Sequence, residues 1–261
     1  MRSILLSALL PFLAASQAAA CAGEDACRLG DRTYQVREPA GWDGVTPLPV
    51  MLHFHGWGRQ GIVPVQSPRT GQAADAAGVL FVAPDGLGRT WDFRRSGSRD
   101  TPFAEQILAQ IEADYPTTDT LIVSGYSWGA LMAARFACET SAQIDALLLI
   151  AGAFSPSIEC AGQPDHVAQV HGLTDTVLDF PFGPNGEQTY ATALWRDRLA
   201  CGEETDRHEW QAVSWLTHER HAWTCALGSV TMDVHSASHL IPRGWVAQVL
   251  GEVLPEAPPA D

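Results

Sequence analysis

The stretch Leu121-Ile122-Val123-Ser124-Gly125-Tyr126-Ser127-Trp128-Gly129-Ala130 decides the fold of this chain. An apolar, β-branched run leads directly into Gly-x-Ser-x-Gly, and Ala-, Leu- and Met-rich helical sequence follows. This strand–turn–helix context is one in which a serine is held on a sharp turn with its Oγ exposed. Side chains at Gly125 or Gly129 would collide where the strand and the helix pack closely. The pattern therefore predicts that Ser127 is a nucleophile. The alternative is an ordinary turn between a strand and a helix.

Short apolar segments alternate with helical segments along the rest of the chain. The hydrophobic periodicity predicts strands at 32–37 (an edge strand), 49–54, 79–83, 120–124, 146–151, 166–170, 208–213 and 229–235. It predicts helices at 70–77, 101–115, 128–138 and 188–200, and a last helix that Pro242 opens and that runs to Leu250. This alternation is typical of an α/β domain with a mostly parallel sheet and helices on both faces.

A nucleophilic serine requires a base, and the base requires an acid that fixes its tautomer and stabilises its cationic form. On a fold of this kind the chain order is Ser, then Asp or Glu, then His, each on a loop after a strand. Asp175 follows the expected strand 166–170 and lies beside the flexible Gly172. It is the expected acid, and Asp179 is its competitor.

His239 is the expected base. It lies in the short loop between the last expected strand and the last helix. His235 ends that strand, where a histidine is as readily a half-buried packing residue. The other histidines considered are interpreted as surface or structural residues: His208, His218 and His221.

Acyl transfer also produces an oxyanion, which preorganised backbone N–H groups must stabilise. One expected donor is the N–H of Trp128, directly after the nucleophile. The other is the N–H of Trp57, in the glycine-rich loop after strand 49–54, with Gly58 as a possible helper. Gly56 and Gly58 would let the backbone turn its N–H groups toward the site. The alternative is an ordinary glycine loop.

Four stretches together resemble a known family: His55-Gly56-Trp57, Gly125-Tyr126-Ser127-Trp128-Gly129, His171-Gly172-Leu173-Thr174-Asp175 and Ser238-His239-Leu240-Ile241-Pro242. Their order and spacing are similar to those of α/β-hydrolases, and more narrowly of the secreted esterases grouped with polyhydroxybutyrate depolymerases and feruloyl or acetylxylan esterases. The resemblance implies the α/β-hydrolase fold and a serine carboxylesterase that works through an acyl-enzyme without a cofactor. The implied substrates are short-chain esters, hydroxyalkanoate oligomers or feruloyl- and acetyl-polysaccharides.

Two further functions stay open at this point. One is a serine peptidase or amidase of the same fold, and the other is a non-catalytic binding protein on a hydrolase scaffold. Trp91, with Trp57 and Trp128, is a candidate for stacking on the substrate at the pocket mouth, the alternative being packing at the edge of the core. Asp85 is a candidate substrate contact, although a turn residue at a strand end is the favoured interpretation.

An even number of cysteines follows the first twenty residues and predicts up to three disulfides in an exported chain. Fifteen pairings are possible, and we expect bonds between neighbours: Cys21 with Cys27, Cys138 with Cys160, and Cys201 with Cys225. A zinc site is the alternative. It is disfavoured because no Cys-x-x-Cys pair is present and the histidines are not clustered with the cysteines, so no metal is expected.

Residues 1–20 resemble a secretory signal peptide, with Arg2 before an apolar run and small residues at Ala18–Ala20. We expect a secreted or periplasmic protein, with a lipid anchor at Cys21 as the minority alternative. Residues 21–254 are expected to form one catalytic domain, and residues 255–261 a disordered tail.

The chain carries 16 arginines, no lysine and 30 acidic residues, for a net charge of −14. Such a surface argues against nucleic acid and anionic membranes as partners. No apolar stretch outside the first twenty residues is long enough to span a bilayer. The expected partner is a small or oligomeric ester substrate, and the expected oligomeric state is a monomer.

Overall fold

The candidate site residues are carried by a ten-stranded sheet. The computed structural model describes Cys21 and residues 25–254 of the 261-residue chain. The strand order across the sheet is β1-β2-β4-β3-β5-β6-β7-β10-β9-β8. The expected signal peptide (1–20) and disordered tail (255–261) lie outside the described residues. Within the described part of the chain, no helix is long and apolar enough to cross a membrane.

The central strands, from β4 across to β10, all run parallel, and antiparallel strands extend the sheet on both sides. The parallel strands are β3 (Leu48–Phe54), β4 (Leu80–Pro84), β5 (Thr117–Tyr126), β6 (Ala146–Ile150), β7 (His166–Gly172) and β10 (Gly228–His235). The antiparallel strands are β1 (Cys27–Leu29), β2 (Arg32–Arg37), β8 (Asp206–Val213) and β9 (Leu216–Cys225).

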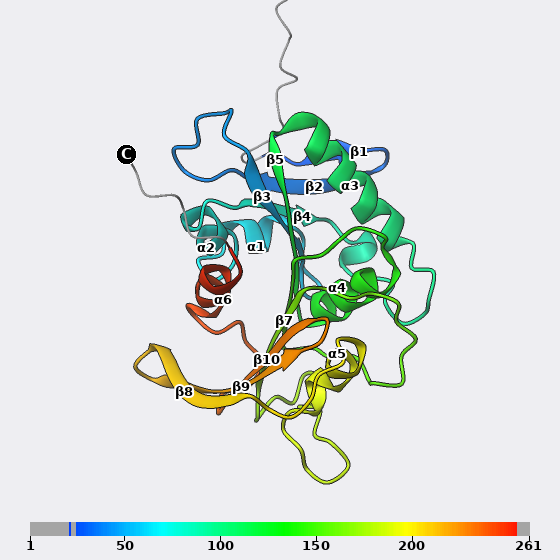
Figure 1. Ribbon diagram of the computed structural model, residues 1–261. Coiled ribbons are helices and arrows are strands. Elements are labelled where there is room, and N and C mark those ends of the chain that lie inside the picture. Colours follow the sequence, from blue (N-terminus) through cyan, green and yellow to red (C-terminus); the bar gives the residue numbers. More distant parts are fainter. Residues whose placement is uncertain (1–20, 22–24, 255–261) are drawn as a thin grey trace, which may run out of the picture.

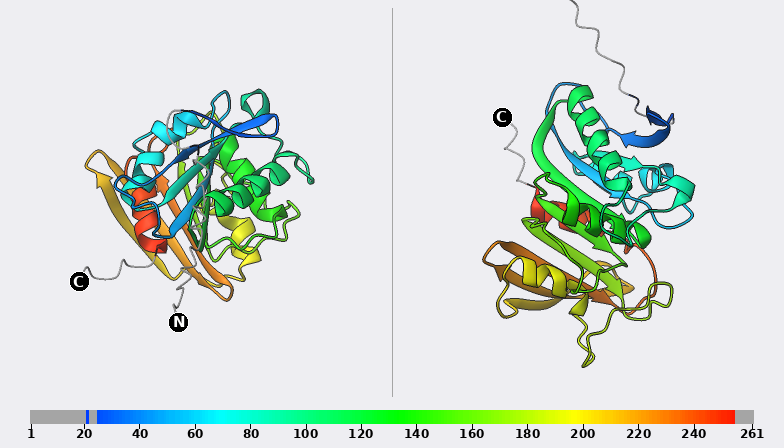
Figure 2. Two further views of the ribbon diagram at one scale, coloured as in Figure 1. Left: turned by 90° about the horizontal axis from the view of Figure 1, so that it is seen from above. Right: turned by 90° about the vertical axis from the view of Figure 1, so that its right-hand side faces the viewer.

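Helices cover both faces of the sheet, as Figures 1 and 2 show. One face carries α3 (Asp100–Asp114), α4 (Trp128–Glu139) and α5 (Ala193–Arg198), and the other carries α1 (Ile62–Gln66), α2 (Gly71–Ala76) and α6 (Trp245–Val253). Each layer buries its own apolar cluster. Phe136 and Trp195 lie in the first cluster, and Trp245 lies in the second. The α/β class expected from the alternation of segments is therefore confirmed.

The parallel strands end at one edge of the sheet, and that edge carries the candidate site. Ser127 directly follows β5, and Trp57 lies in the loop after β3. Asp175 follows β7, and His239 follows β10. Loops at the carboxyl ends of parallel strands are where α/β proteins place their ligand sites. Residues far apart in sequence therefore meet there.

Two expected helices differ from the observed ones. Residues 188–200 do not form one helix: a 3₁₀ turn, η2 (Tyr190–Thr192), precedes the short α5, and Thr192 bonds its hydroxyl back to the carbonyl of Thr189 at 2.8 Å. The last helix begins at Trp245 rather than at Pro242, because Gly244 has φ +83°, a left-handed conformation that interrupts a helix.

Strand β9 was not expected from the sequence, nor were β1 and α1. Along β9 the buried positions include His218 and Arg220, so the usual alternation of apolar and polar residues is hidden. Arg220 is buried because it forms an ion pair with the fully buried Asp233 of β10. His218 and His221 are thus structural residues within the sheet, whereas His208 lies exposed on β8.

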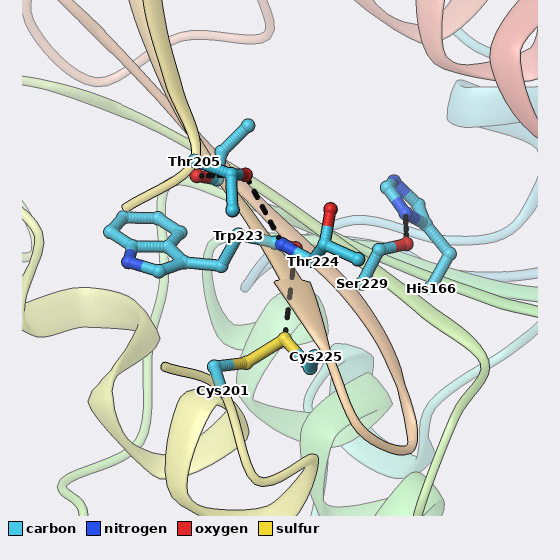
Figure 3. Close-up of a disulfide and its surroundings, with 8 residues drawn as sticks. His166, Cys201, Thr205, Trp223, Thr224, Cys225 and Ser229 are labelled. Carbon is cyan, nitrogen blue, oxygen red and sulfur yellow. Dashed lines mark hydrogen bonds between the residues drawn. A yellow bond between two sulfur atoms is a disulfide. The ribbon is translucent and has the colours of Figure 1, made fainter. Parts of the chain in front are cut away.

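Three disulfides join Cys21 to Cys27, Cys138 to Cys160 and Cys201 to Cys225, which are the neighbour pairs expected from the sequence. The third ties the segment after α5 to the end of β9 (Figure 3). Beside it, the Thr205 hydroxyl accepts the N–H of Thr224 at 3.2 Å. The first disulfide uses the sulfur atom of Cys21 that a lipid anchor would require.

Candidate active site

Ser127 lies on a strained turn between β5 and α4. Its φ of +58° and ψ of −123° are rare for a residue with a side chain and cost about 1–3 kcal/mol. Its N–H donates to the carbonyl of Ile150 at 2.8 Å, and its own carbonyl accepts the N–H of Ala130 at 2.9 Å. The surrounding glycines make the turn possible, because a Cβ at Gly129 would overlap backbone atoms of Phe54.

A continuous hydrogen-bond chain links the three residues expected to form the triad. Nδ1 of His239 lies 2.6 Å from Oδ2 of Asp175, and Nε2 of His239 lies 2.8 Å from Oγ of Ser127. A carboxylate oxygen only accepts, so Nδ1 of His239 carries the proton. Nε2 is therefore free to accept the proton of the serine hydroxyl. This is the tautomer that a general base needs.

The carboxylate of Asp175 accepts hydrogen bonds at both oxygens. Oδ1 accepts the backbone N–H groups of Val177 at 2.8 Å and Leu178 at 3.2 Å, and Oδ2 accepts from His239 and from His171. Burial would raise the pKa of Asp175, but the hydrogen bonds from His239 and Val177 and the nearby imidazoles outweigh burial and lower that pKa. The carboxylate thus remains ionised and can stabilise an imidazolium.

The two competing residues lie elsewhere. Asp179 is exposed, and among the described residues no hydrogen bond joins it to His239. His235 is buried at the end of β10, more deeply than the half-buried packing residue expected. Burial and the neighbouring His218 and His171 lower its pKa to about 4.

The loop after β3 is held close to the nucleophile. His55 is buried, its Nδ1 donates to the carbonyl of Gly56 at 2.9 Å, and its Nε2 accepts the N–H of Gly86 at 3.0 Å. A Cβ at Gly56 would lie only 3.6 Å from the Cβ of Ser127. The backbone that leads into Trp57 therefore passes directly beside Ser127.

Two backbone N–H groups near Ser127 are unbonded. Within the described part of the chain, neither Trp57 nor Trp128 donates its backbone N–H to any other group. Gly58 does not share this property, because its N–H donates to the carbonyl of Arg89 at 2.8 Å. The structure thus contradicts the expectation that Gly58 assists as an oxyanion donor.

Aromatic side chains form a surface beside these N–H groups. The indole of Trp57 is 63% exposed, and its ring centroid lies 5.9 Å from that of Trp128. Phe93 packs edge-on against Trp128 at 5.6 Å, and the guanidinium of Arg94 lies 4.7 Å from the same indole ring. An exposed aromatic surface of this kind can stack on a planar group of a ligand.

A pocket of about 300 Å³ is lined by Gly56 and Tyr126, the residues that directly precede Trp57 and Ser127. Tyr126 lines it, donates its hydroxyl to the carbonyl of His239 at 3.1 Å, and packs its ring 5.0 Å from the imidazole. The other lining residues are mostly apolar or small: His53, His55, Gly56, Arg59, Val63, Pro64, Ser67 and Ile241. A larger cavity of about 680 Å³ lies at the opposite edge of the sheet, near the start of β5, and is remote from Ser127.

For two candidate substrate contacts, the structure favours the structural alternative over a contact with substrate. Trp91 is buried in the core, donates its indole N–H to the carbonyl of His55 at 2.7 Å, and packs edge-on against Phe54. Asp85 accepts the N–H of Gly61 at 2.7 Å and the hydroxyl of Thr33 at 2.6 Å. Asp85 thus anchors the loop that carries Trp57, as the favoured interpretation as a turn residue implies.

Sequence reasoning gave no role to Tyr126 or His171, although both stand in the quoted motifs. Tyr126 immediately precedes the serine and supports His239. His171 contacts the carboxylate of Asp175. Tyr126 contacts a residue far away in the sequence, whereas the contact of His171 depends on the path of the turn that follows β7. Hydrophobic periodicity predicts neither contact.

Comparisons with known proteins show which proteins the chain resembles. No protein-family model matches the chain. It is 28% identical over 171 residues to feruloyl esterase C of Emericella nidulans, covering 63% of each chain. It is 29% identical over 205 residues to feruloyl esterase D of Neurospora crassa, covering 69% of each. The match spans about three fifths of the length of the feruloyl esterase C relatives, 63% in one and 59% in another.

An acetyl xylan esterase from Aspergillus awamori has a similar structure, with a TM-score of 0.66 at 13% identity over 85% of this chain and 94% of that one. The fold is therefore that of an α/β-hydrolase. Within that class, the resemblance to the feruloyl and acetylxylan esterase group indicated by the motifs is confirmed.

Proposed function

We propose that this chain is a serine carboxylesterase. Ser127 attacks the carbonyl carbon of an ester while His239 accepts its proton, and the protonated His239 then delivers that proton to the departing alkoxide. Asp175 holds His239 in the required tautomer and stabilises its cationic form. Water, activated by His239, then hydrolyses the acyl-enzyme. The observation that carries the proposal is the Ser127–His239–Asp175 hydrogen-bond chain, with its distances of 2.8 and 2.6 Å.

The unbonded N–H groups of Trp57 and Trp128 are proposed to form the oxyanion hole. Both flank Ser127, one from the loop after β3 and one from the first turn of α4. An N–H that is already bonded elsewhere cannot stabilise a developing charge, so their free state supports this role. Loss of one such donor raises the barrier by roughly 3 kcal/mol.

The proposed substrates are esters with a planar aromatic acyl group, of the feruloyl type. The exposed Trp57 next to Trp128 offers a stacking surface, and the relatives named feruloyl esterases support this choice. The pocket beside Tyr126 is proposed to receive one substituent of the ester. Acetyl esters of polysaccharides are the alternative substrates of the same mechanism.

We further propose that the protein functions outside the reducing cytosol. Three disulfides within the described residues support an oxidising compartment, because such bonds are rare in cytosolic proteins.

Hydrolysis of methyl ferulate, ethyl acetate and a p-nitrophenyl ester series tests the proposal. We expect wild type to turn over esters, and Ser127→Ala to lose about 10⁴-fold or more in kcat. Ser214→Ala, an exposed serine between β8 and β9, is the matched control and should retain full activity. Hydrolysis of an anilide but of no ester would instead identify an amidase. Inactivity of wild type on every ester would contradict the proposal.

A further inference from the structure

A second histidine shares the acid of the triad. Nε2 of His171 lies 3.0 Å from Oδ2 of Asp175, the oxygen that also accepts from Nδ1 of His239 at 2.6 Å. His171 is the penultimate residue of β7, and its side chain is 1% exposed. One carboxylate oxygen therefore receives hydrogen bonds from two imidazoles, one on β7 and one in the loop after β10.

The tautomer of His171 follows from its partners. Its Nε2 also lies 3.1 Å from the carbonyl oxygen of Leu178. A carbonyl and a carboxylate can only accept, so Nε2 must carry the proton and donate to both. Nδ1 is then without a proton, and it is buried with no hydrogen-bond partner among the described residues. His171 acts as a donor toward Asp175 while remaining neutral.

The surroundings keep His171 in that form. Burial lowers its pKa, more than the carboxylate of Asp175 raises it. The ring of Phe180 packs edge-on against it at 5.3 Å, which leaves little room for rotation. The titratable groups near it are Asp175, His239 and His235, with His218 and Asp233 behind His235 and Asp179 across a small cavity of about 160 Å³.

We propose that His171 is a positioning residue for Asp175, a role that rests on the esterase function proposed above. Oδ1 of Asp175 is held by the N–H groups of Val177 and Leu178, and His171 holds the remaining oxygen. Together they fix the carboxylate plane so that Oδ2 points at His239. Because His171 also withdraws charge from Oδ2, the carboxylate stabilises the imidazolium of His239 less than a carboxylate without this donor would.

Loss of the donor should thus have two effects on catalysis. A less firmly oriented carboxylate positions His239 less well, which lowers kcat. A carboxylate relieved of one hydrogen bond binds the imidazolium of His239 more strongly, which holds the base in its inactive protonated form up to a higher pH. The acidic limb of the pH profile of kcat/KM therefore moves toward higher pH.

A matched pair of substitutions separates this role from simple packing. Glutamine places an N–H₂ group near the position of Nε2, and methionine has a similar length and volume without any donor. His171→Met should lower kcat about tenfold with KM changed less than about twofold, and should move the acidic half-activity point up by roughly 0.5 pH unit. His171→Gln should restore most of both properties.

His235→Met is the control. His235 is equally buried one strand away, but it forms no hydrogen bond with Asp175. This variant should keep the wild-type kcat and acidic limb. Rates are referred to the concentration of sites titrated by a p-nitrophenyl phosphonate, so that partial unfolding is not read as lost catalysis. If His171→Met does not fold, His171→Leu takes its place against His171→Gln.

An unshifted acidic limb with an unchanged kcat in His171→Met would overturn the proposal. So would equal losses in the Gln and Met variants, or in His235→Met, because these would indicate packing alone. Inactivity of wild type on all esters would instead reject the esterase function itself, and the two failures are thus distinguishable.

Discussion

The guanidinium of Arg220 on β9 donates two hydrogen bonds to the carboxylate of Asp233 on β10, from Nε at 2.9 Å and from Nη2 at 2.7 Å. Asp233 also accepts the indole N–H groups of Trp210 at 2.8 Å and Trp245 at 2.7 Å. Four elements, β8, β9, β10 and α6, thus meet at one buried carboxylate. The strand that leads to His239 is held by this cluster.

Removal of that carboxylate should destabilise the fold strongly. We expect Asp233→Ala to lower the free energy of unfolding by about 3–5 kcal/mol, because Arg220 would remain buried without its partner. Glu252→Gln is the control: Glu252 accepts from Arg220 on the partly exposed side, and its loss should cost about 1 kcal/mol or less. Urea denaturation measures the free energy of unfolding of both variants. Similar decreases would show that the buried Arg220–Asp233 pair contributes no more than the partly exposed Arg220–Glu252 pair.

Because the backbone at Ser127 is strained, we expect a glycine at this position to stabilise the fold while abolishing activity. Glycine adopts a φ of +58° without the steric penalty of a side chain, whereas alanine keeps that penalty. Both Ser127→Gly and Ser127→Ala should be inactive, but the glycine variant should be more stable by about 1 kcal/mol. Thermal unfolding of the two variants decides this. A lower melting temperature for the glycine variant would mean that the turn stores no strain.

The side chain and the backbone of Trp57 should affect different kinetic constants. Trp57→Ala removes the exposed indole but keeps the N–H. With methyl ferulate we expect KM to rise about fivefold and kcat to change less than about twofold, since one stacking contact contributes about 1 kcal/mol. Ethyl acetate should be unaffected. Trp215→Ala, another indole that is 63% exposed, is the control. A loss of kcat on both esters would place the indole in the oxyanion hole itself.

Buried histidines should make the protein sensitive to acid. The pKa of His235 is lowered to about 4 by burial and by its histidine neighbours, whereas an unfolded histidine titrates near pH 6.5. As the pH falls below 6.5, the unfolded state therefore gains a proton before the native state does, and stability is lost until about pH 4.

At pH 5 this single group should account for roughly 2 kcal/mol of lost stability relative to pH 7.5. His235→Met should reduce the loss in the free energy of unfolding between pH 7.5 and pH 5 by that amount, as urea denaturation at the two pH values measures. Ser214→Ala, at an exposed position without a titratable side chain, should leave the dependence of stability on pH unchanged. If the stability of His235→Met and that of wild type fell in parallel with pH, His235 would not be the source of the acid sensitivity.

Much of the fold could be predicted because its signals are local. Parallel strands such as β5 and β6 are short apolar runs, and Ser127, Asp175 and His239 each follow the end of such a strand. Because β5, β7 and β10 are parallel, Ser, Asp and His at their carboxyl ends meet at one edge of the sheet. This is why the candidate triad could be named from sequence, although its catalytic role stays a prediction.

The elements that could not be predicted are stabilised by partners elsewhere in the sequence. Strand β9 buries His218 and Arg220, which are acceptable in a sheet interior only because Asp233 and Trp210 lie on neighbouring strands. Similarly, the sequence left two interpretations open for Trp91 and Asp85, a substrate contact and a structural role. Their hydrogen-bond partners, His55 and Gly61, turn them into supports of the neighbouring loop.

In chain order, the first cysteine is bonded to the second, the third to the fourth and the fifth to the sixth, with separations of 6, 22 and 24 residues. A chain that enters an oxidising compartment amino terminus first presents its thiols in that same order. When the second, fourth or sixth thiol emerges, only its native partner is then still unpaired. Oxidation in order of emergence would thus give the native set directly, and we predict that maturation does not depend on an isomerase. The yield of active protein should accordingly be the same in hosts with and without a disulfide isomerase.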